Sequence, residues 1–517
     1  MHKQSLLIIT NKMEKLSKRL ERPPCYIGLR GLCCKNCLMG PCILAKPEDV
    51  GACGANRDVV VSRNILRFVA GGAAAHSGHA FHLLEYLKKK YPENYIEKKA
   101  PKYLFKVWDK LGIVPKIHFE HFKDISEALH TSTMGVNADY QDIIKWTMKL
   151  GIVDGYYGLY LATELEDNAY GKPSIKKGIV DLGVIDEKKI NIAVHGHEPM
   201  LAEALEKEVS KKENQDINLV GVCCTGASLL SRHGIPLAAN VVLQEDVIST
   251  GLIEAMAVDV QCIFPSLQSI VECFHTQLIT TNEIAKMPSA IHLPVTSKNA
   301  QQVAKKIISI ARKNRKKRNE SRVNISKKKK EVVVGFTEDN LPLKEIARQI
   351  KNREIKGIIA VIGCVNPRVK EDWISTYKEL SKDYIILADG CQGFSLGQAG
   401  LLDGKRFFHV GSCVNNARVA EIFKRLAEIC KKQITDMPFL ISSPAPLAEK
   451  CIAIGFFFAA LGVDVHFGYP FMLTSDSKIA GFLENVLKNK FRSKIFLETS
   501  PEKFLARLKK EGLSYKS

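Results

Sequence analysis

Six cysteines crowd into one short segment near the start of the chain: Cys25, Cys33, Cys34, Cys37, Cys42 and Cys53. Thiolates at this spacing let one stretch of backbone wrap an iron–sulfur cubane, and the glycines between them permit the turns that such ligation requires. The last four cysteines supply a complete ligand set for one [4Fe–4S] cluster. Structural zinc is the alternative, but zinc would leave the other two cysteines and the glycine pattern unused.

The remaining pair, Cys25 and Cys33, is two thiolates short of the four that a second [4Fe–4S] cluster needs. A two-fold axis supplies the missing pair, because an isologous interface brings the same residues of both subunits face to face. The ligand count therefore predicts a homodimer with one cluster shared across its axis.

A second set of donors is scattered in sequence, but each member follows a short apolar run that is typical of a strand: His197, Cys224, Cys262, Cys364, Cys391 and Cys413. Sites in doubly wound sheets lie outside the carboxyl ends of the strands, so these side chains can converge in one crevice between two α/β units. One imidazole and five thiolates exceed what one zinc ion or a plain [4Fe–4S] cluster uses. The set predicts a larger, heteronuclear cluster, against the alternative of ordinary buried thiols. Four other cysteines lack this setting and are expected to be core or surface thiols: Cys223, Cys273, Cys430 and Cys451.

Two further features could move protons or charge. His76, His79 and His82 recur at three-residue intervals and would share one face of a helix, where groups that titrate near neutrality can relay protons. A surface helix with incidental histidines is the alternative. Lys450 precedes an apolar run and could place one positive charge at the edge of a buried site.

The elements that must position these residues change in character near residue 189. Helical periodicity dominates before this point, for example in the stretches that begin at Asn64 and Tyr140. Short apolar strands alternating with helices follow: Ile190–Val194, Ile217–Val222, Ala257–Val260, Gly357–Ile362, Tyr384–Ala388, Arg406–Val410, Phe439–Ser442 and Val463–Phe467. We predict a multidomain α/β protein, with a helical iron–sulfur domain over residues 1–188 and Rossmann-like doubly wound domains over residues 189–330 and 331–517.

Composition agrees with this organisation. The 517 residues are 46% hydrophobic and 25% charged, values that are ordinary for a globular protein, and the length is too great for one core. No apolar run reaches the roughly 20 residues that span a bilayer, and Leu6–Ile9 is too short for an export signal. We expect a cytoplasmic protein without a membrane span. In that compartment the fifteen cysteines indicate metal binding rather than disulfides.

The formal charge of +20 is concentrated in one segment, because Lys305–Lys330 holds thirteen Lys and Arg residues against the single acid Glu320. The segment lacks the interleaved aromatic residues that are typical of nucleic-acid binding, so we favour a solvated helix end and linker, and predict no nucleic-acid partner. Steering of an acidic redox partner is compatible with this interpretation.

Several motifs together resemble those of nickel–iron carbon monoxide dehydrogenases, in the same order along residues 25–475: Gly31-Leu-Cys-Cys-Lys-Asn-Cys-Leu-Met-Gly-Pro-Cys42, Ala73-Ala-Ala-His-Ser77, Thr133-Met-Gly-Val-Asn137, Ala162-Thr-Glu-Leu165, His195-Gly-His197, Cys223-Cys-Thr-Gly226, Arg232-His-Gly-Ile-Pro236 and Gly411-Ser-Cys-Val414. The resemblance implies an anaerobic enzyme that interconverts CO and CO2 at a Ni–Fe–S cluster and passes electrons through [4Fe–4S] clusters to a ferredoxin-like acceptor. The physiological direction, and an attached acetyl-CoA synthase or hydrogenase, stay open.

The resemblance also implies a role for each residue of the two sets. A relay cluster would be held by Cys34, Cys37, Cys42 and Cys53, and a cluster shared between two subunits by Cys25 and Cys33. At the active cluster, Cys413 would bind nickel, His197 and Cys224 the iron outside the cubane, and Cys262, Cys364 and Cys391 the other irons. His195 is the rival imidazole to His197.

Beside that cluster, the resemblance implies that His76 and Lys450 flank the substrate, that Ile454 lines the gas pocket, and that His79 and His82 continue the proton path. The chain departs from the family in the short Cys391–Cys413 stretch, in the short arm before Cys25, and in the surroundings of Cys391, which read Asp389-Gly-Cys-Gln-Gly. A hybrid-cluster-type reductase and an iron–sulfur electron carrier or redox sensor are the alternative functions. A carrier needs neither His76 nor Lys450.

Overall fold

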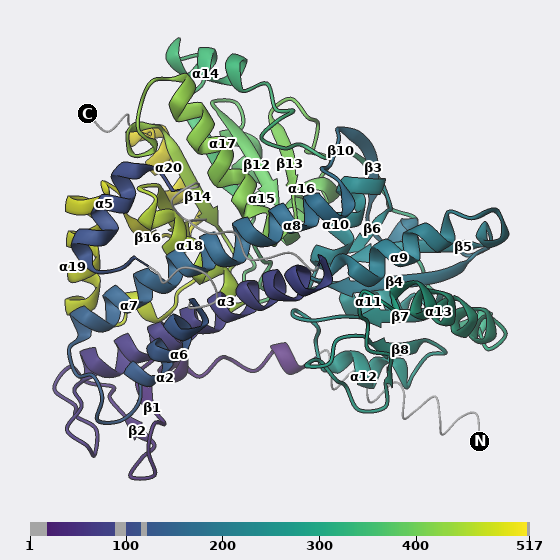
Figure 1. Ribbon diagram of the computed structural model, residues 1–517, viewed down its shortest axis with the longest axis horizontal. Coiled ribbons are helices and arrows are strands. Elements are labelled where there is room, and N and C mark those ends of the chain that lie inside the picture. The colour runs from purple at the N-terminus through teal and green to yellow at the C-terminus, as the bar shows by residue number, and fades with distance from the viewer. Residues whose placement is uncertain (1–17, 88–99, 115–120, 514–517) are drawn as a thin grey trace.

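A computed structural model describes residues 18–87, 100–114 and 121–513. The long helix α3 crosses the middle of the molecule, with one parallel sheet above it, a second sheet to the right and the cysteine-rich β1–β2 hairpin at the lower left (Figure 1). The predicted multidomain α/β architecture with a helical N-terminal part is therefore confirmed. The apolar patch Leu6–Ile9 lies outside the described residues.

The N-terminal part is helical apart from the hairpin of β1 (Cys33–Cys34) and β2 (Cys42–Ile43). Its helices are α2 (Tyr26–Leu29), α3 (Arg57–Leu87), α5 (Lys102–Leu111), α6 (His121–Thr131), α7 (Tyr140–Val153), a π-helical segment (Asp154–Tyr160) and α8 (Leu161–Tyr170). Helix α3 buries Val61, Ile65, Val69 and Ala73, which recur every four residues and so form one apolar face. The same helix continues into the three histidines.

The first sheet has the order β10-β3-β6-β5-β4-β7-β8-β9. Its strands are β3 (Lys176–Val180), β4 (Ile190–Gly196), β5 (Ile217–Val222), β6 (Leu237–Ala239), β7 (Ile253–Val258), β8 (Gln277–Thr280), β9 (Ile291–His292) and β10 (Lys330–Val334). Strand β10 runs antiparallel to β3, and the other neighbours are parallel. Because β3 precedes residue 189 and β10 continues past residue 330, this sheet extends beyond the expected boundaries at both ends.

The second sheet is parallel throughout, with the order β13-β12-β11-β14-β15-β16. Its strands are β11 (Gly357–Val361), β12 (Tyr384–Asp389), β13 (Phe407–Gly411), β14 (Phe439–Ser443), β15 (Asp464–Phe467) and β16 (Ile495–Leu497). Numbered within this sheet, the order is 3-2-1-4-5-6, and strands β4 to β9 of the first sheet have the same order. Both sheets are therefore Rossmann-like, with a switch point between their first and fourth strands, where sites form.

Helices connect and cover the strands of both sheets. In the first unit they are α9 (Pro199–Val209), α10 (Cys223–His233), α11 (Gln244–Ser249), α12 (Ser266–Val271) and α13 (Ala300–Arg315). In the second they are α14 (Leu343–Lys351), α15 (Trp373–Leu380), α16 (Gly390–Gln398), α17 (Asn416–Ile429), α18 (Glu449–Ala460), α19 (Ser477–Val486) and α20 (Pro501–Glu511). Within the described ranges, no helix is both long and apolar enough to cross a membrane.

Helix α18 is buried along its whole length and packs closely on α3 and the π-helical segment. The close approach requires glycine, since a Cβ on Gly72 would lie 2.7 Å from the Cβ of Ala453, and one on Gly158 would lie 2.6 Å from the Cβ of His76. The first contact fixes the helix that carries Lys450 against the helix that carries the histidines, and the second fixes the π-helical segment against that same histidine helix.

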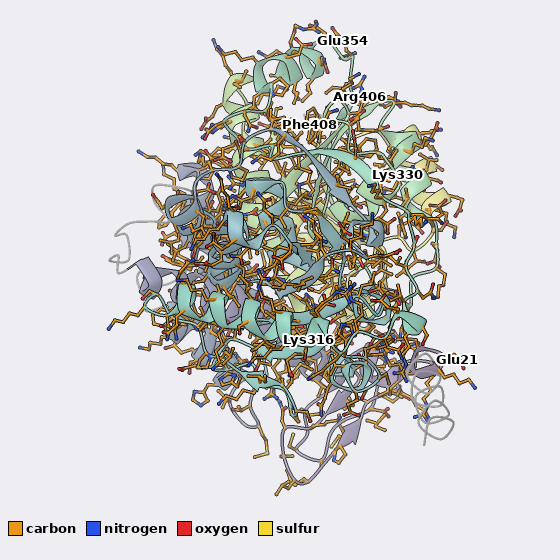
Figure 2. All side chains as sticks on the ribbon, turned by 90° about the vertical axis from the view of Figure 1, so that its right-hand side faces the viewer. Glu21, Lys316, Lys330, Glu354, Arg406 and Phe408 are labelled. Atoms are coloured by element: carbon orange, nitrogen blue, oxygen red, sulfur yellow. The ribbon has the colours of Figure 1, made fainter. Side chains whose placement is uncertain are left out.

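The basic segment begins in α13, whose apolar face packs on the first sheet. Figure 2 shows Lys316 at the end of this helix, on the face turned to the viewer. The prediction of a solvated helix end and linker holds for most of its cations, but Arg318 is buried and its guanidinium lies 2.6 Å from the Glu254 carboxylate. That cation anchors the segment to the protein, because a buried charge persists only when it is paired.

Candidate metal centre

The carboxyl ends of the two sheets meet, and the predicted strand-end donors meet there. His197, Cys224 and Cys262 follow the first, second and fourth strands of the first Rossmann-like order. Cys364, Cys391 and Cys413 follow the first, second and third strands of the other. The two groups are in contact, since the backbone N–H of Cys413 donates to the sulfur of Cys224 at 3.5 Å. We call this convergence the strand-end site.

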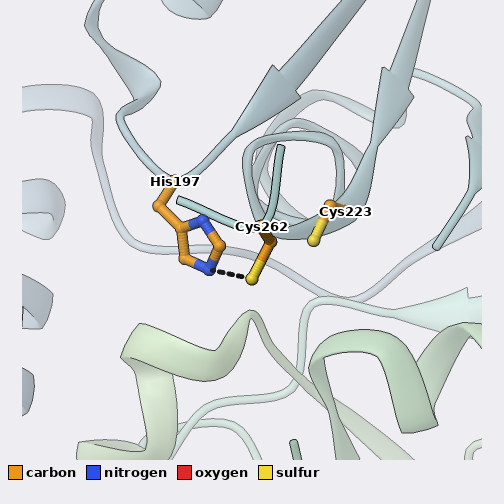
Figure 3. Close-up of side chains that lie close together, drawn as sticks. All are labelled: His197, Cys223 and Cys262. Atoms are coloured by element: carbon orange, nitrogen blue, oxygen red, sulfur yellow. Dashed lines mark hydrogen bonds between the residues drawn. The ribbon is translucent and has the colours of Figure 1, made fainter. Parts of the chain in front are cut away.

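His197 points toward Cys262 in the strand-end site, with Cys223 nearby (Figure 3). Its Nε2 is 4.0 Å from the sulfur of Cys262 and 2.9 Å from Nζ of Lys450. Burial opposes charge on the ring, but the nearby Cys224 and Cys262 sulfurs raise the pKa of His197 to about 10. The 4.0 Å distance places the ring next to a sulfur donor, as a metal-binding imidazole would be.

His195, the rival imidazole, has a different environment. It lies in β4, is fully buried, and its Nε2 is 3.0 Å from Oε1 of Gln244. Burial lowers the pKa of His195 to about 4, so this ring stays neutral within the scaffold. The geometry supports His197, rather than His195, as the member of the donor set.

Lys450 extends into the strand-end site from the first turn of α18. Its ammonium donates to Oε1 of Gln261 at 2.8 Å and to the sulfur of Cys262 at 3.3 Å. Burial works to lower the pKa of Lys450, but the surrounding cysteine sulfurs, Cys262 first, raise it above its usual range. A permanent positive charge therefore lies among the sulfur donors. Ile454 lies one helical turn further along α18 and is fully buried.

Cys223 and Cys451 are buried, as expected of core thiols, but both lie beside the predicted donors. The ligand atoms of Cys223, His197 and Cys262 all lie within 4.8 Å of one another, and the sulfur of Cys223 is 3.8 Å from that of Cys391. The sulfur of Cys451 is 3.2 Å from that of Cys364. Sequence reasoning missed them because Cys223 adjoins a stronger candidate and Cys451 follows no strand directly.

Two buried carboxyl groups support the loops of the strand-end site. Asp259 accepts hydrogen bonds from the backbone N–H of His197 at 2.6 Å and from the hydroxyl of Thr225 at 2.9 Å. Burial raises the pKa of Asp259 to about 7. Asp389 accepts from the backbone N–H of Gly363 at 3.2 Å, while its Oδ2 has no partner in the described structure. Burial raises its pKa well above the ordinary range. Both lie where a strand ends, but no sequence motif marks them as supports of the site.

The backbone is strained where ligand loops enter the site. Cys223, Gln261 and Cys262 have φ values of 57°, 68° and 56°, in the left-handed region that side chains other than glycine rarely adopt. Such strain persists only where the surrounding structure enforces it, and it clusters at functional sites.

Two of the sequence motifs hold the site together from outside. The hydroxyl of Thr163 donates to the carbonyl of Val414 at 3.2 Å, directly after Cys413. Arg232 pairs with Glu166 at 3.3 Å and with Asp167 at 3.1 Å, all three largely buried. These residues fix the helical domain against both sheets.

Each of the three histidines on α3 is paired with a carboxylate. His76 Nδ1 is 2.6 Å from Asp154, and His79 Nε2 is 3.1 Å from Glu166. His82 bonds to Glu198, the neighbour of His197. The side chains are 0%, 1% and 32% exposed in that order, so the row leads from the interior to solvent. Asp154 belongs to the π-helical segment, a distortion that is frequent at functional sites.

The beginning of this row is linked to the strand-end site by one side chain. The amide of Gln261 donates to the carbonyl of Ala75 at 3.0 Å, and its oxygen accepts from Lys450. His76 directly follows Ala75, and its Nε2 is buried without a hydrogen-bond partner in the described structure. His76 is thus attached, through one backbone contact, to the residues around Cys262.

The N-terminal cysteines lie in a separate hairpin and in the segments that flank it. Strands β1 and β2 pair Cys34 with Cys42, and the sulfur of Cys42 accepts from the backbone N–H of Ala52 at 3.4 Å. The sulfur of Cys25 accepts from the N–H of Gly28 at 3.4 Å. Backbone donors to sulfur are the contacts that stabilise a thiolate bound to a cluster. Cys25 and Cys53 are exposed, and the other four are partly so.

Apolar side chains surround these cysteines without being covered. The most exposed are Tyr26 (63%), Leu38 (104%), Met39 (59%), Ile43 (63%) and Val50 (64%). Single exposed apolar residues are ordinary, but several within one short segment favour an interaction surface. We call these five residues the hairpin patch.

The donors of the strand-end site fit a heteronuclear iron–sulfur cluster. They are seven buried or nearly buried sulfurs with one imidazole: Cys223, Cys224, Cys262, Cys364, Cys391, Cys413, Cys451 and His197. Thiolates with an imidazole suit soft and borderline metals such as iron, nickel and zinc. Their number exceeds the four that a single zinc ion binds, which favours a multinuclear group.

Comparisons with known proteins agree with this arrangement. The model of the Prismane/CO dehydrogenase family matches residues 32–97 and 83–502. Carbon monoxide dehydrogenase 1 of Methanosarcina mazei is 30% identical over 96% of this chain and 92% of its own. The solved carbon monoxide dehydrogenase IV of Carboxydothermus hydrogenoformans superposes with a TM-score of 0.90 at 32% identity, over 96% of each chain. An as-isolated, nickel-free carbon monoxide dehydrogenase from Thermococcus sp. AM4 superposes with a TM-score of 0.88 at 29% identity, over 97% of this chain and 94% of its own.

Proposed function

This chain belongs to the Prismane/CO dehydrogenase family as an oxidoreductase of the carbon monoxide dehydrogenase type, and we propose that it catalyses CO + H2O ⇌ CO2 + 2 H⁺ + 2 e⁻ at the strand-end site. The observation that carries the proposal is the convergence of the six predicted donors with a buried lysine in one site. A structural iron–sulfur centre needs the donors but not the lysine.

The strand-end donors would hold a Ni–Fe–S cluster, with Cys413 toward nickel, His197 and Cys224 toward the outer iron, and Cys262, Cys364 and Cys391 toward the other irons. When bound, the cluster supplies a metal that binds CO, a second metal that acidifies water, and a store for two electrons. The protein excludes bulk water from this place, because the donor side chains are almost fully buried. Low solvent access strengthens every electrostatic interaction there.

Lys450 provides the fixed charge that the reaction requires. On the way to CO2, negative charge develops on the oxygen atoms bonded to the substrate carbon. A preorganised ammonium lowers the energy of that charge, and the protein need not reorganise to do so. Its contacts with Gln261 and Cys262 fix the ammonium before substrate arrives. His76 is held by Asp154 and would act from the α3 side, where its free Nε2 can donate or accept a proton. Ile454 would line the pocket for the small apolar gas.

Protons would leave along α3. The order of the pairs runs His76 with Asp154, His79 with Glu166, and His82 with Glu198. Burial would raise the pKa of Glu166 and Glu198, but hydrogen bonds from His79 and His82 respectively keep both pKa values below the usual one. Each carboxylate is within hydrogen-bonding distance of its imidazole, and a row of such pairs would pass protons toward the partly exposed His82.

Electrons would leave through the hairpin. Cys34, Cys37, Cys42 and Cys53 would hold a [4Fe–4S] relay cluster, and Cys25 with Cys33 would hold half of a cluster shared with a second subunit. The exposed hairpin patch supports this homodimer, since it lies within the segment that the second subunit would cover. A ferredoxin-like protein would accept the electrons near the axis.

A hybrid-cluster-type reductase remains the second candidate, since the matching family model covers both kinds of protein. The experiment that separates them uses anaerobically purified protein, with nickel and iron counted per subunit and CO-dependent reduction of methyl viologen measured in the same sample. We expect nickel and CO-dependent turnover. Full iron without nickel, together with reduction of hydroxylamine instead of oxidation of CO, would overturn the proposal.

A further inference from the structure

Cys451 occupies a topological position that the other sheet uses for a ligand. In the first sheet the donors that follow strands 1 and 4 are His197 and Cys262, which flank the switch point. In the second sheet Cys364 follows strand 1, and the loop after strand 4, β14, leads into the first turn of α18, where Cys451 lies. Cys364 and Cys451 therefore follow the same two strand positions in the second sheet as His197 and Cys262 follow in the first, although the connecting loops differ in length.

The contacts of Cys451 agree with this equivalence. Its side chain is 1% exposed, and its sulfur lies 3.2 Å from that of Cys364. The loop before Cys364 leaves room for that sulfur only because residue 363 is glycine, since a Cβ there would lie 2.8 Å from it. The preceding residue, Lys450, contacts Cys262 on the other side of the same site. The first turn of α18 thus faces the donors of both sheets.

We infer that Cys451 is a seventh protein ligand of the active cluster, bound at the metal atom that Cys364 holds. The inference rests on the proposed function, because it concerns the same cluster. Two sulfurs bound at about 2.3 Å to one metal lie roughly 3–4 Å apart, which is the spacing of this pair. A cysteine buried only for packing needs no second thiol at that distance.

A double ligand at one corner changes how that corner responds to mutation. If both sulfurs bind the same metal, loss of either leaves one thiolate in place, whereas loss of both leaves none. Cys364→Ser and Cys451→Ser should then each retain most of the cluster, and the double variant should lose it. Such non-additivity is the signature of residues that act on one group.

The test uses the full-length protein purified without oxygen, as wild type, Cys451→Ser, Cys364→Ser and the double variant. Cys273→Ser is the matched control, since Cys273 is buried and its sulfur contacts the carbonyl of Ser269. The readouts are nickel and iron per subunit during a chelator challenge, and the electron paramagnetic resonance spectrum of the active cluster. Serine is close in size to cysteine, which separates ligation from packing.

We expect Cys451→Ser to shift the g values of the active cluster and to speed loss of its metals by roughly 10–100-fold, the range found when a metal's supporting residues are removed. The control should behave as wild type. Wild-type spectra and metal retention in Cys451→Ser, or additive effects in the double variant, would overturn the inference. A wild-type protein without nickel or CO turnover would instead overturn the proposed function, and the spectral comparison would still report on Cys451.

Discussion

The chain presents cysteines in two settings that differ in how they are built. At the strand-end site Cys224 and Cys413 are 2% and 5% exposed, and the donors come from loops at the ends of two sheets. On the hairpin, Cys25 and Cys53 are exposed and Leu38 is fully so. The first setting is fixed by long-range packing, whereas the second is fixed by short-range turns.

This difference matches two chemical requirements. A reaction that develops charge benefits from a dry, preorganised site, in which a lysine and several carboxyl groups can be held without water. Electron transfer to a second protein requires instead that the donor cluster lie near the surface. Under the proposed function the hairpin would gain its rigidity from bound metal and from a partner, because a few turns with little core cannot hold charged thiolates at fixed spacing alone.

The largest expected effect comes from removing the proposed nickel ligand, Cys413. Cys413→Ala should abolish nickel binding and CO oxidation, while the iron of the hairpin clusters is retained, because their ligands lie in another domain. Metal content and iron–sulfur absorbance measure this directly, with Cys430→Ala as a control at a buried thiol outside the site. Loss of hairpin iron in proportion to nickel would mean that the two settings are not independent.

Removing Lys450 or His76 beside the proposed cluster should reduce activity less than removing Cys413. Lys450→Ala and His76→Ala are each expected to lower kcat by roughly 10²–10⁴-fold with nickel and iron unchanged, the range for positioned acid–base or electrostatic groups. His130→Ala, at an exposed histidine, is the matched control. Near-normal turnover of either site variant with full metal would exclude that residue from the reaction.

Variants of the N-terminal cysteines should show the opposite pattern to Cys413→Ala, with iron lost and nickel retained. Cys25→Ser/Cys33→Ser should remove about two irons per subunit, since half of a [4Fe–4S] cluster belongs to each subunit. Nickel should remain, while the dimer weakens and ferredoxin reduction slows. Iron analysis, mass in solution and electron delivery to ferredoxin give the three readouts. An unchanged iron count would show that these two cysteines hold no shared cluster.

The smallest expected effect concerns the free energy of unfolding and a buried histidine of the second sheet, His466. Burial lowers the pKa of His466 to about 3, so the unfolded chain binds this proton more readily than the folded one. The neutral ring therefore contributes to the free energy of unfolding, and this contribution is fully present above about pH 6.5. The contribution decreases as the pH falls toward 3, and about 2 kcal/mol of it is lost at pH 5. His466→Gln should flatten the dependence of the urea midpoint on pH between these values. An unchanged slope would mean that the ring is protonated in the fold.

The six strand-end donors were predictable because apolar runs identify strands and the residue after a strand has a defined place in a doubly wound sheet. The short strand β6, the edge strand β10 and its neighbour β3 were not, because a few residues with little apolar periodicity give no reliable signal. For the same reason the expected boundary at residue 189 separated β3 from the sheet to which it belongs.

The partners of the site were harder to predict than its donors. Cys451 belongs to a helix whose uniformly apolar sequence hides which residue faces the site, and Asp259 acts through backbone N–H groups that no motif reveals. The carboxylate partners of the histidines come from the distant segments of Asp154, Glu166 and Glu198. Tertiary packing alone brings them to α3.

The separation of the two settings can be tested in one measurement, a crystal structure of the anaerobically purified protein with anomalous difference maps recorded at the nickel and iron edges. We predict one nickel peak per subunit beside Cys413, with iron around it toward His197 and Cys364. Iron without nickel should appear at the hairpin and on the two-fold axis between Cys25 and Cys33 of both subunits. A nickel peak at the hairpin, or a strand-end site that holds only a single zinc or iron ion, would contradict the account.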